Sequence, residues 1–174
     1  GVFTSYVISK KRTKAITSVA VLGPNSLLIL TAKQELYRFD KQTNRYTRLK
    51  LNTAIKSIVK GNQTPYILGE NNVIYKVNKQ GNLYPWFNSL APIRTIQYCN
   101  NQVFIFTSTG VFSMNATNRK GKLKRMFRAV KGLNIANITA MVHTDGVYYF
   151  ATNQEGLFTL DQRGKLNYYK ANLF

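Results

Sequence analysis

The sequence predicts an all-β protein, a β-propeller made of four-stranded blades, and three observations support this prediction. An aliphatic residue, an aromatic residue, a polar residue, an apolar residue and then Asp or Asn occur together four times, as LYRFD, IYKVN, VFSMN and LFTLD. The surrounding segments are rich in Val, Ile, Leu, Tyr, Phe and Thr and lack the apolar period of a helix. The unit recurs about every 40 residues, which is the length of one propeller blade.

Each unit contains four short segments that read as strands. The first opens on an Ile and is expected to line the central channel; the four anchors are Ile16, Ile55, Ile93 and Ile138. A second apolar run follows at 27–32, 65–70, 102–108 and 146–152. The repeated phrase is the third strand, and a fourth run, such as RYTRLKL or LNYYKAN, is the rim strand.

The third strand carries two further expectations. Its aliphatic and aromatic residues should lie on opposite faces and both pack in the core, because both faces of a blade meet a neighbouring blade. These residues are Leu36, Ile74, Val111 and Leu157 on one face and Tyr37, Tyr75, Phe112 and Phe158 on the other. The closing Asp or Asn should bind the backbone of the next turn; these residues are Asp40, Asn78, Asn115 and Asp161.

The predicted elements divide the chain into four full blades at 15–53, 54–91, 92–136 and 137–174. Residues 1–14 are expected to supply one or two strands of an incomplete blade. We therefore expect the ring to be completed by another chain or by a segment missing from this sequence. The only stretch that could hold a helical turn is 128–136. No run approaches the roughly 20 apolar residues of a membrane-spanning helix, so no membrane span is expected.

The charge balance points to an anionic partner. The chain has 25 Lys and Arg residues against 6 Asp and Glu residues, a formal net charge of +19, and a sequence pI near 10.2. A field of this sign attracts nucleic acid, anionic lipid headgroups, lipopolysaccharide and sulfated or uronic-acid glycans. The alternative is a generally basic surface that only maintains solubility.

The segments ITSVAVLGPNSLLILTAKQELYRFD (16–40) and ITAMVHTDGVYYFATNQEGLFTLD (138–161) resemble the two-component regulator propeller repeat. The two middle blades share its apolar skeleton, so the resemblance spans nearly the whole chain. It implies a periplasmic or extracytoplasmic sensor propeller, typically of glycans, connected through a membrane segment to an output domain. NHL-repeat propellers are similar in length and apolar pattern, and that resemblance implies RNA binding on a basic face.

The first candidate site is one mouth of the channel. The residues that follow the four anchors are expected to lie near that mouth on the innermost strands. Two cations and two hydroxyls could there bind an anionic group through charge-assisted hydrogen bonds. The alternative is solvated strand ends. The predicted ligand-binding residues are Thr17, Lys56, Arg94 and Thr139.

The second candidate site is the rim of the third blade, where the segment NRKGKLKRMFRAVK carries seven cations and no acid. It could bind phosphate or sulfate groups of a polyanion, contact a missing partner segment, or serve only as a charged edge that prevents aggregation. The predicted polyanion-binding residues are Arg119, Lys120, Lys122, Lys124, Arg125 and Arg128, with Lys131 beside them.

The residues for catalysis are few, so no enzymatic activity, cofactor or metal site is expected. His143 and Asp145 lie beside a predicted turn, Cys99 ends a predicted strand, and Glu35 and Glu155 occupy equivalent loop positions. No phosphate-binding loop or nucleophile motif occurs. The sequence thus favours a binding module that senses an anionic ligand, such as an acidic glycan; the alternatives are an NHL-like nucleic-acid binder and a protein-interaction scaffold.

Overall fold

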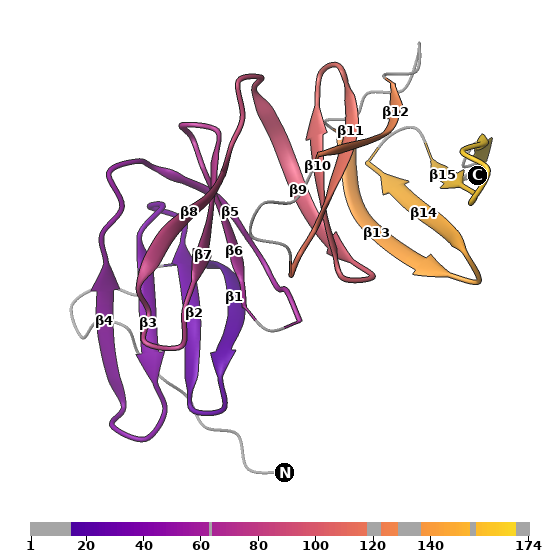
Figure 1. The fold of residues 1–174 in the computed structure, drawn as a ribbon. Helices are drawn as coiled ribbons and strands as arrows, with labels where there is room; N and C mark the ends of the chain where they lie inside the picture. The colour runs from indigo at the N-terminus through magenta and orange to yellow at the C-terminus, as the bar shows by residue number, and fades with distance from the viewer. Residues whose placement is uncertain (1–14, 63, 118–122, 129–136, 154–155, 170–174) are drawn as a thin grey trace. The chain divides into compact units, whose positions relative to one another are not determined.

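The structure is a computed structural model that describes residues 15–62, 64–117, 123–128, 137–153 and 156–169 of the 174-residue chain. These residues form four antiparallel sheets, each of four strands in chain order, and no helix (Figure 1). This architecture confirms the predicted all-β propeller made of four-stranded blades. The predicted strands within 1–14 and the helical turn at 128–136 lie outside the described residues, apart from Arg128 at the end of a strand.

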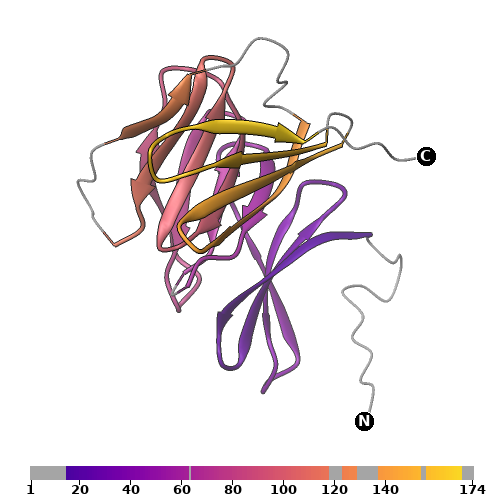
Figure 2. The same ribbon diagram turned by 90° about the vertical axis from the view of Figure 1, so that its right-hand side faces the viewer.

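The first two sheets contain strands β1–β4 and β5–β8. Their bounds are β1 Ile16–Gly23, β2 Ser26–Thr31, β3 Leu36–Asp40, β4 Arg45–Leu49, β5 Ile55–Val59, β6 Tyr66–Gly69, β7 Val73–Val77 and β8 Leu83–Asn88. The β1–β4 sheet, indigo and violet in Figure 2, is strongly twisted, as the sterics of L-residues dictate.

The last two sheets contain strands β9–β12 and β13–β16. Their bounds are β9 Ile93–Cys99, β10 Gln102–Thr107, β11 Gly110–Asn115, β12 Lys124–Arg128, β13 Ile138–Thr144, β14 Val147–Thr152, β15 Leu157–Leu160 and β16 Leu166–Tyr169. Every neighbouring pair of strands within a sheet is antiparallel.

The chain divides into two compact units between Asn88 and Ser89. In the first unit β1 contacts β5, so the first strands of both sheets lie next to each other. The two sheets share one core that includes Leu28, Leu36, Ile55 and Ile67. Leu28 and Ile67 are fully buried. Neither sheet of this pair would bury its apolar face alone.

The second unit repeats this arrangement, and β9 contacts β13. Its core contains four phenylalanine rings, with Phe106 and Phe150 edge to face at 6.2 Å between ring centroids. Large aromatic side chains thus take a larger part in this cluster than in the shared cluster of the first unit, whose buried members are aliphatic.

The turn residues after the third strands behave as predicted. The carboxylate of Asp40 accepts hydrogen bonds from the backbone N–H groups of Gln42 and Thr43, both at 3.0 Å. Asn78 accepts from the N–H of Asn82 at 2.9 Å, and Asn115 accepts from that of Thr117 at 2.9 Å. The carboxylate of Asp161 accepts from the N–H groups of Arg163 and Lys165.

The core prediction for the third strand is only partly correct. Leu36, Ile74, Val111 and Phe158 are buried, whereas Leu157 is 37% exposed. Three of the aromatics, Tyr37, Tyr75 and Phe112, are only half-buried. The two tyrosines keep their hydroxyls near polar partners: Tyr37 donates to Glu35 at 3.3 Å, and Tyr75 accepts from the amide of Asn71 at 2.9 Å.

Candidate functional site

The antiparallel order of the strands brings three kinds of segment to the same end of each blade. A first strand begins there, the turn between the second and third strands lies there, and the fourth strand ends there. We call this the strand-start end. The four predicted ligand-binding residues lie at this end, because each is the second residue of a first strand.

Each of these four residues is the extra residue of a β-bulge. In the first sheet Ile16 and Ser18 pair with the consecutive residues Thr31 and Leu30, so that Thr17 has no residue opposite it on β2. The same register shift isolates Lys56, Arg94 and Thr139 in the other sheets. A bulge bends its strand and redirects the side chain of the extra residue. All four side chains are exposed.

The two threonines use their hydroxyls within their own sheets. Thr17 Oγ1 donates to the carbonyl of Leu30 at 3.2 Å, and Thr139 Oγ1 donates to the carbonyl of Ala151 at 3.3 Å. Both acceptors lie opposite the bulge on the second strand. These hydroxyls therefore supply a hydrogen bond to the disrupted ladder, and their part in ligand binding stays a prediction.

Lys56 and Arg94 carry a positive charge at the bulge position of the second and third sheets. Lys56 Nζ lies 3.7 Å from the carboxylate of Glu70, which belongs to the β6–β7 turn of the same sheet. Both side chains are substantially exposed, so solvent weakens this ion pair. Arg94 is exposed at the equivalent position of the third sheet. Lys56 and Arg94 are the two cations of the predicted set, and binding of an anion by them stays a prediction.

Within each unit, two of the predicted residues lie on first strands that contact each other. Thr17 and Lys56 lie on the neighbouring strands β1 and β5 of the first unit, and Arg94 and Thr139 lie on β9 and β13 of the second. Their convergence on one ligand stays a prediction.

The bulges were missed by sequence reasoning, although a signal for them exists. Ile55 and Ile58 are both buried, as are Ile93 and Ile96. Residues three apart lie on opposite faces of a regular strand, so apolar residues at this spacing require one extra residue between them. The spacing I-x-x-I in IKSI and IRTI therefore indicates the bulge.

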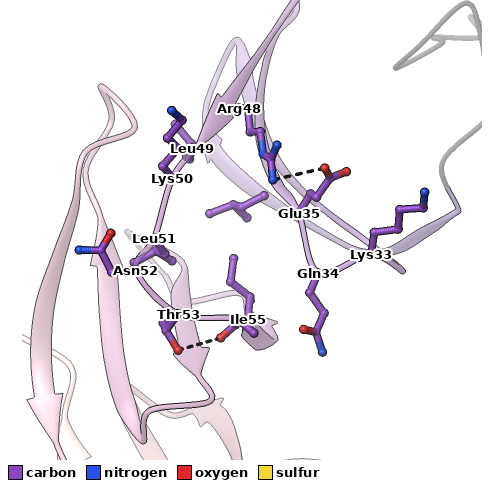
Figure 3. Close-up of a pocket in the computed structure, with 12 residues that line it drawn as sticks. Lys33, Gln34, Glu35, Arg48, Leu49, Lys50, Leu51, Asn52, Thr53 and Ile55 are labelled. Carbon is purple, nitrogen blue, oxygen red and sulfur yellow. Dashed lines mark hydrogen bonds and ion pairs between the residues drawn. The ribbon is translucent and has the colours of Figure 1, made fainter.

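A cavity of about 440 Å³ lies at the strand-start end of the first unit. Its walls come from the turn after β2, the end of β4 and the connection to β5 (Figure 3). The lining residues are Lys33, Gln34, Glu35, Leu36, Arg48, Leu49, Lys50, Leu51, Asn52, Thr53, Ala54 and Ile55. Sequence reasoning missed this cavity, because the connection carries no repeated pattern.

The second candidate site, the rim of the third blade, lies only partly within the described residues. Lys124 and Arg125 lie on the edge strand β12 with exposed side chains, and the guanidinium of Arg125 lies over the ring of Phe112 at 5.2 Å. The positions of Arg119, Lys120, Lys122 and Lys131, and the side chain of Arg128, lie outside the described residues. Polyanion binding by this rim stays a prediction.

The candidate reactive groups have structural roles. The ring of His143 packs on that of Tyr148 at 4.4 Å, and Asp145 adopts a positive φ of 50° in the β13–β14 turn, where it accepts a hydrogen bond from Thr144. Burial raises the pKa of the Cys99 thiol, which disfavours the nucleophilic thiolate. Glu35 forms an ion pair with Arg48, and Glu155 lies outside the described residues. Among the described residues, no group of three or more His, Cys, Asp or Glu side chains could hold a metal ion.

The sequence matches no protein-family model and no curated protein. Solved structures, in contrast, share its fold. The chain superposes on the extracellular domain of a Bacteroides thetaiotaomicron protein described as a hybrid two component system, with a TM-score of 0.67 and 15% identity over 93% of this chain and 23% of that one. It also superposes on PorZ, a surface component of the type-IX secretion system of Porphyromonas gingivalis, with a TM-score of 0.64 and 17% identity over 96% of this chain and 22% of that one.

A third structure of the same fold is a catalytically inactive virginiamycin B lyase from Staphylococcus aureus, with a TM-score of 0.69 and 12% identity over 95% of this chain and 58% of that one. The chain thus spans about a quarter of the first two structures and little more than half of the third. At these identities the likeness shows the fold that the chain shares with extracellular propeller domains.

None of the described residues belongs to a helix that could traverse a lipid bilayer.

Proposed function

We propose that the chain is a non-enzymatic, ligand-binding part of an extracytoplasmic sensor propeller, and that it recognises an anionic ligand such as an acidic glycan. The observation that carries this proposal is the bulge shared by all four sheets, which exposes Lys56 and Arg94 at the strand-start end. The likeness to the extracellular domain of a two-component system protein supports the sensor role.

The charge of the molecule supports an anionic ligand. A net charge of +19 raises the local concentration of anions, and Lys56 and Arg94, each exposed at the strand-start end of its own blade, are cations with which an anion can pair. Lys56 already pairs with a carboxylate, Glu70, at 3.7 Å, so its ammonium group sits where a ligand carboxylate or sulfate could replace that partner.

The roles of His143, Asp145 and Cys99 support binding over catalysis. His143 and Asp145 belong to a packed strand and its turn, and the raised pKa of Cys99 keeps its thiol protonated. Because the lyase shows that related propellers can occur among enzymes, this part of the proposal rests on the chemistry of these residues and not on the fold.

A competition experiment tests the ligand class. Binding of a fluorescent galacturonic acid hexasaccharide and of a sulfated hexasaccharide is measured at physiological salt, with and without an excess of single-stranded RNA. A glycan sensor keeps its affinity for one of the two oligosaccharides in the presence of RNA. Loss of all oligosaccharide binding to the competitor, together with a preference for defined RNA sequences, would contradict the proposal and favour a nucleic-acid binder.

A further inference from the structure

The cavity of the first unit has the size and the lining of a small-molecule site. Its volume of about 440 Å³ lies within the range of ligand pockets in proteins, roughly 300 to 1,000 Å³. At ~30 Å³ for each water molecule in the liquid, it has room for about fifteen waters or a ligand of similar bulk. All of its lining residues belong to one compact unit, either to its two sheets or to the connections 33–35 and 50–54.

The inner part of the cavity is aliphatic. Leu36 and Ile55 belong to the shared core and are almost fully buried, and Leu49 and Leu51 pack against the same core while remaining partly exposed. Figure 3 shows Leu51 and Ile55 pointing toward the cavity. Such a floor takes up a hydrocarbon chain with a gain of hydrophobic free energy.

One side of the cavity carries a cation that already binds a carboxylate. Arg48 Nη2 lies 3.3 Å from Glu35 Oε1, and Figure 3 shows this pair at the edge of the cavity. Glu35 also accepts a hydrogen bond from the hydroxyl of Tyr37, so it keeps a polar partner if Arg48 turns to another carboxylate. The guanidinium group, with its fork of N–H donors, suits a carboxylate better than an ammonium group does.

The side chains of Lys33, Lys50 and Asn52 extend away from the cavity in Figure 3. Arg48 is therefore the cation best placed to meet a ligand inside it. None of the lining residues is aromatic, and the innermost side chains, Leu36 and Ile55, are aliphatic. Hydroxyl groups of a sugar placed against these two side chains would lose hydrogen bonds to water, which costs free energy.

We propose that this cavity binds an aliphatic carboxylate, whose hydrocarbon chain packs on Leu36, Leu51 and Ile55 and whose carboxylate pairs with Arg48. Two sources share this chemistry, namely a short fatty acid and the C-terminal residue of a peptide that ends in Leu or Ile. The site goes beyond the glycan-sensing function proposed above, because it uses neither Lys56 nor Arg94.

Titrations followed by backbone NMR shifts test the site and separate the two sources. The probes are hexanoate and N-acetyl-leucine, each compared with its neutral amide. We expect at least one carboxylate to shift the resonances of residues 33–36 and 48–55, and the corresponding amide to bind about tenfold more weakly or worse. Binding of hexanoate alone indicates a fatty acid, and binding of N-acetyl-leucine alone indicates a peptide end.

Two variants of the ion pair are expected to change affinity in opposite directions. Arg48→Met removes the cation and should weaken carboxylate binding about tenfold, a modest loss for a charged hydrogen bond because Arg48 is partly exposed. Glu35→Gln removes the competing carboxylate and should strengthen binding a few-fold. The control Arg45→Met lies on the same strand, is exposed, and does not line the cavity, so it should bind as the parent does.

A cavity-filling variant tests the location independently. Leu51→Trp should abolish binding of every probe while the thermal unfolding transition remains cooperative. The proposal is overturned if neither carboxylate shifts these residues, if the amides bind as tightly as the acids, or if Glu35→Gln weakens binding as much as Arg48→Met does.

Discussion

Thr17, Lys56, Arg94 and Thr139 share one backbone position but divide into two chemical roles. A β-bulge leaves an unpaired residue in the ladder, and a hydroxyl at that residue can reach the carbonyl opposite, as Thr17 and Thr139 do. Lys56 and Arg94 at the same position are exposed, and Lys56 Nζ lies 3.7 Å from the carboxylate of Glu70. The same position thus stabilises the sheet in two blades and offers charge in the other two.

The threonine role predicts a loss of stability on removal of the hydroxyl. Thr17→Val and Thr139→Val keep the shape of the side chain but remove the donor to Leu30 and Ala151, respectively. Each should lower the free energy of unfolding by about 0.5–1 kcal/mol, the lower part of the range for a hydrogen bond because the sites are partly solvated. Urea denaturation measures the loss. The Thr→Ser variants keep the hydroxyl and should retain most of the parent's free energy of unfolding. Equal stability of Val and Thr would show that the hydroxyl contributes nothing.

Asp40 predicts a dependence of stability on pH. The backbone N–H of Thr43 foremost, and that of Gln42 and the charge of Arg38 to a smaller extent, hold the pKa of the Asp40 carboxyl below its ordinary value of 3.8. Because the pKa in the folded state is depressed, the stabilisation is complete above the unfolded pKa of about 4 and is lost as the pH falls through the folded pKa.

We therefore expect Asp40→Asn to be less stable than the parent at pH 7 and to approach the parent in stability at pH 2 to 3. Urea titrations at both values measure this difference. A difference that is unchanged by acid would assign the effect to geometry instead of charge.

At the scale of the strands, the sequence repeat predicted the features that neighbouring residues determine, namely the positions of the third strands and the turns that follow them. The repeated phrase located the third strands, and the acceptors that end them, such as Asp40 and Asn78, bind the turns as expected. Burial was harder to predict because it depends on which surface covers a residue. Ile16 has the same sequence context as Ile55, yet it is 50% exposed while Ile55 is buried.

The sequence could not predict the cavity for a related reason. Its floor combines Leu36 and Ile55, which lie in different blades, and its wall includes the connection 50–54, which has no counterpart in the repeat. Only the packing of one sheet on the other brings these residues together.

The shared core predicts that the β1–β4 and β5–β8 sheets lose structure together. Leu28 is fully buried and packs in the cluster that contains Ile67 and Val77 of the second sheet. Leu28→Ala should destabilise the unit by about 2–5 kcal/mol. Hydrogen exchange should then show lower amide protection in β6 and β7 as well as in β2. The neighbouring variant Leu27→Ala, at a half-buried site on the opposite face of β2, should cost less and spare β6 and β7. Loss confined to β1–β4 would show that the sheets are independent.

At the scale of the whole molecule, charge and fold indicate a class of function but not a site. The excess of cations predicts an anionic partner, and the repeat predicts a propeller. Neither distinguishes the strand-start end from the basic rim that contains Lys124 and Arg125. The bulges make this distinction testable, because they place single cations at equivalent positions of known register.

The most direct test of the proposed sensor site is isothermal titration of the parent, of Lys56→Ala/Arg94→Ala and of a control with an acidic hexasaccharide at physiological salt. The control, Lys79→Ala/Arg163→Ala, removes the same charge from exposed turns at the opposite ends of the second and fourth sheets. We predict that the Lys56/Arg94 variant binds at least tenfold more weakly, as expected for lost charged hydrogen bonds, and that the control binds within about twofold of the parent. Unchanged affinity in the Lys56/Arg94 variant, or an equal loss in the control, would contradict a site at the strand-start end.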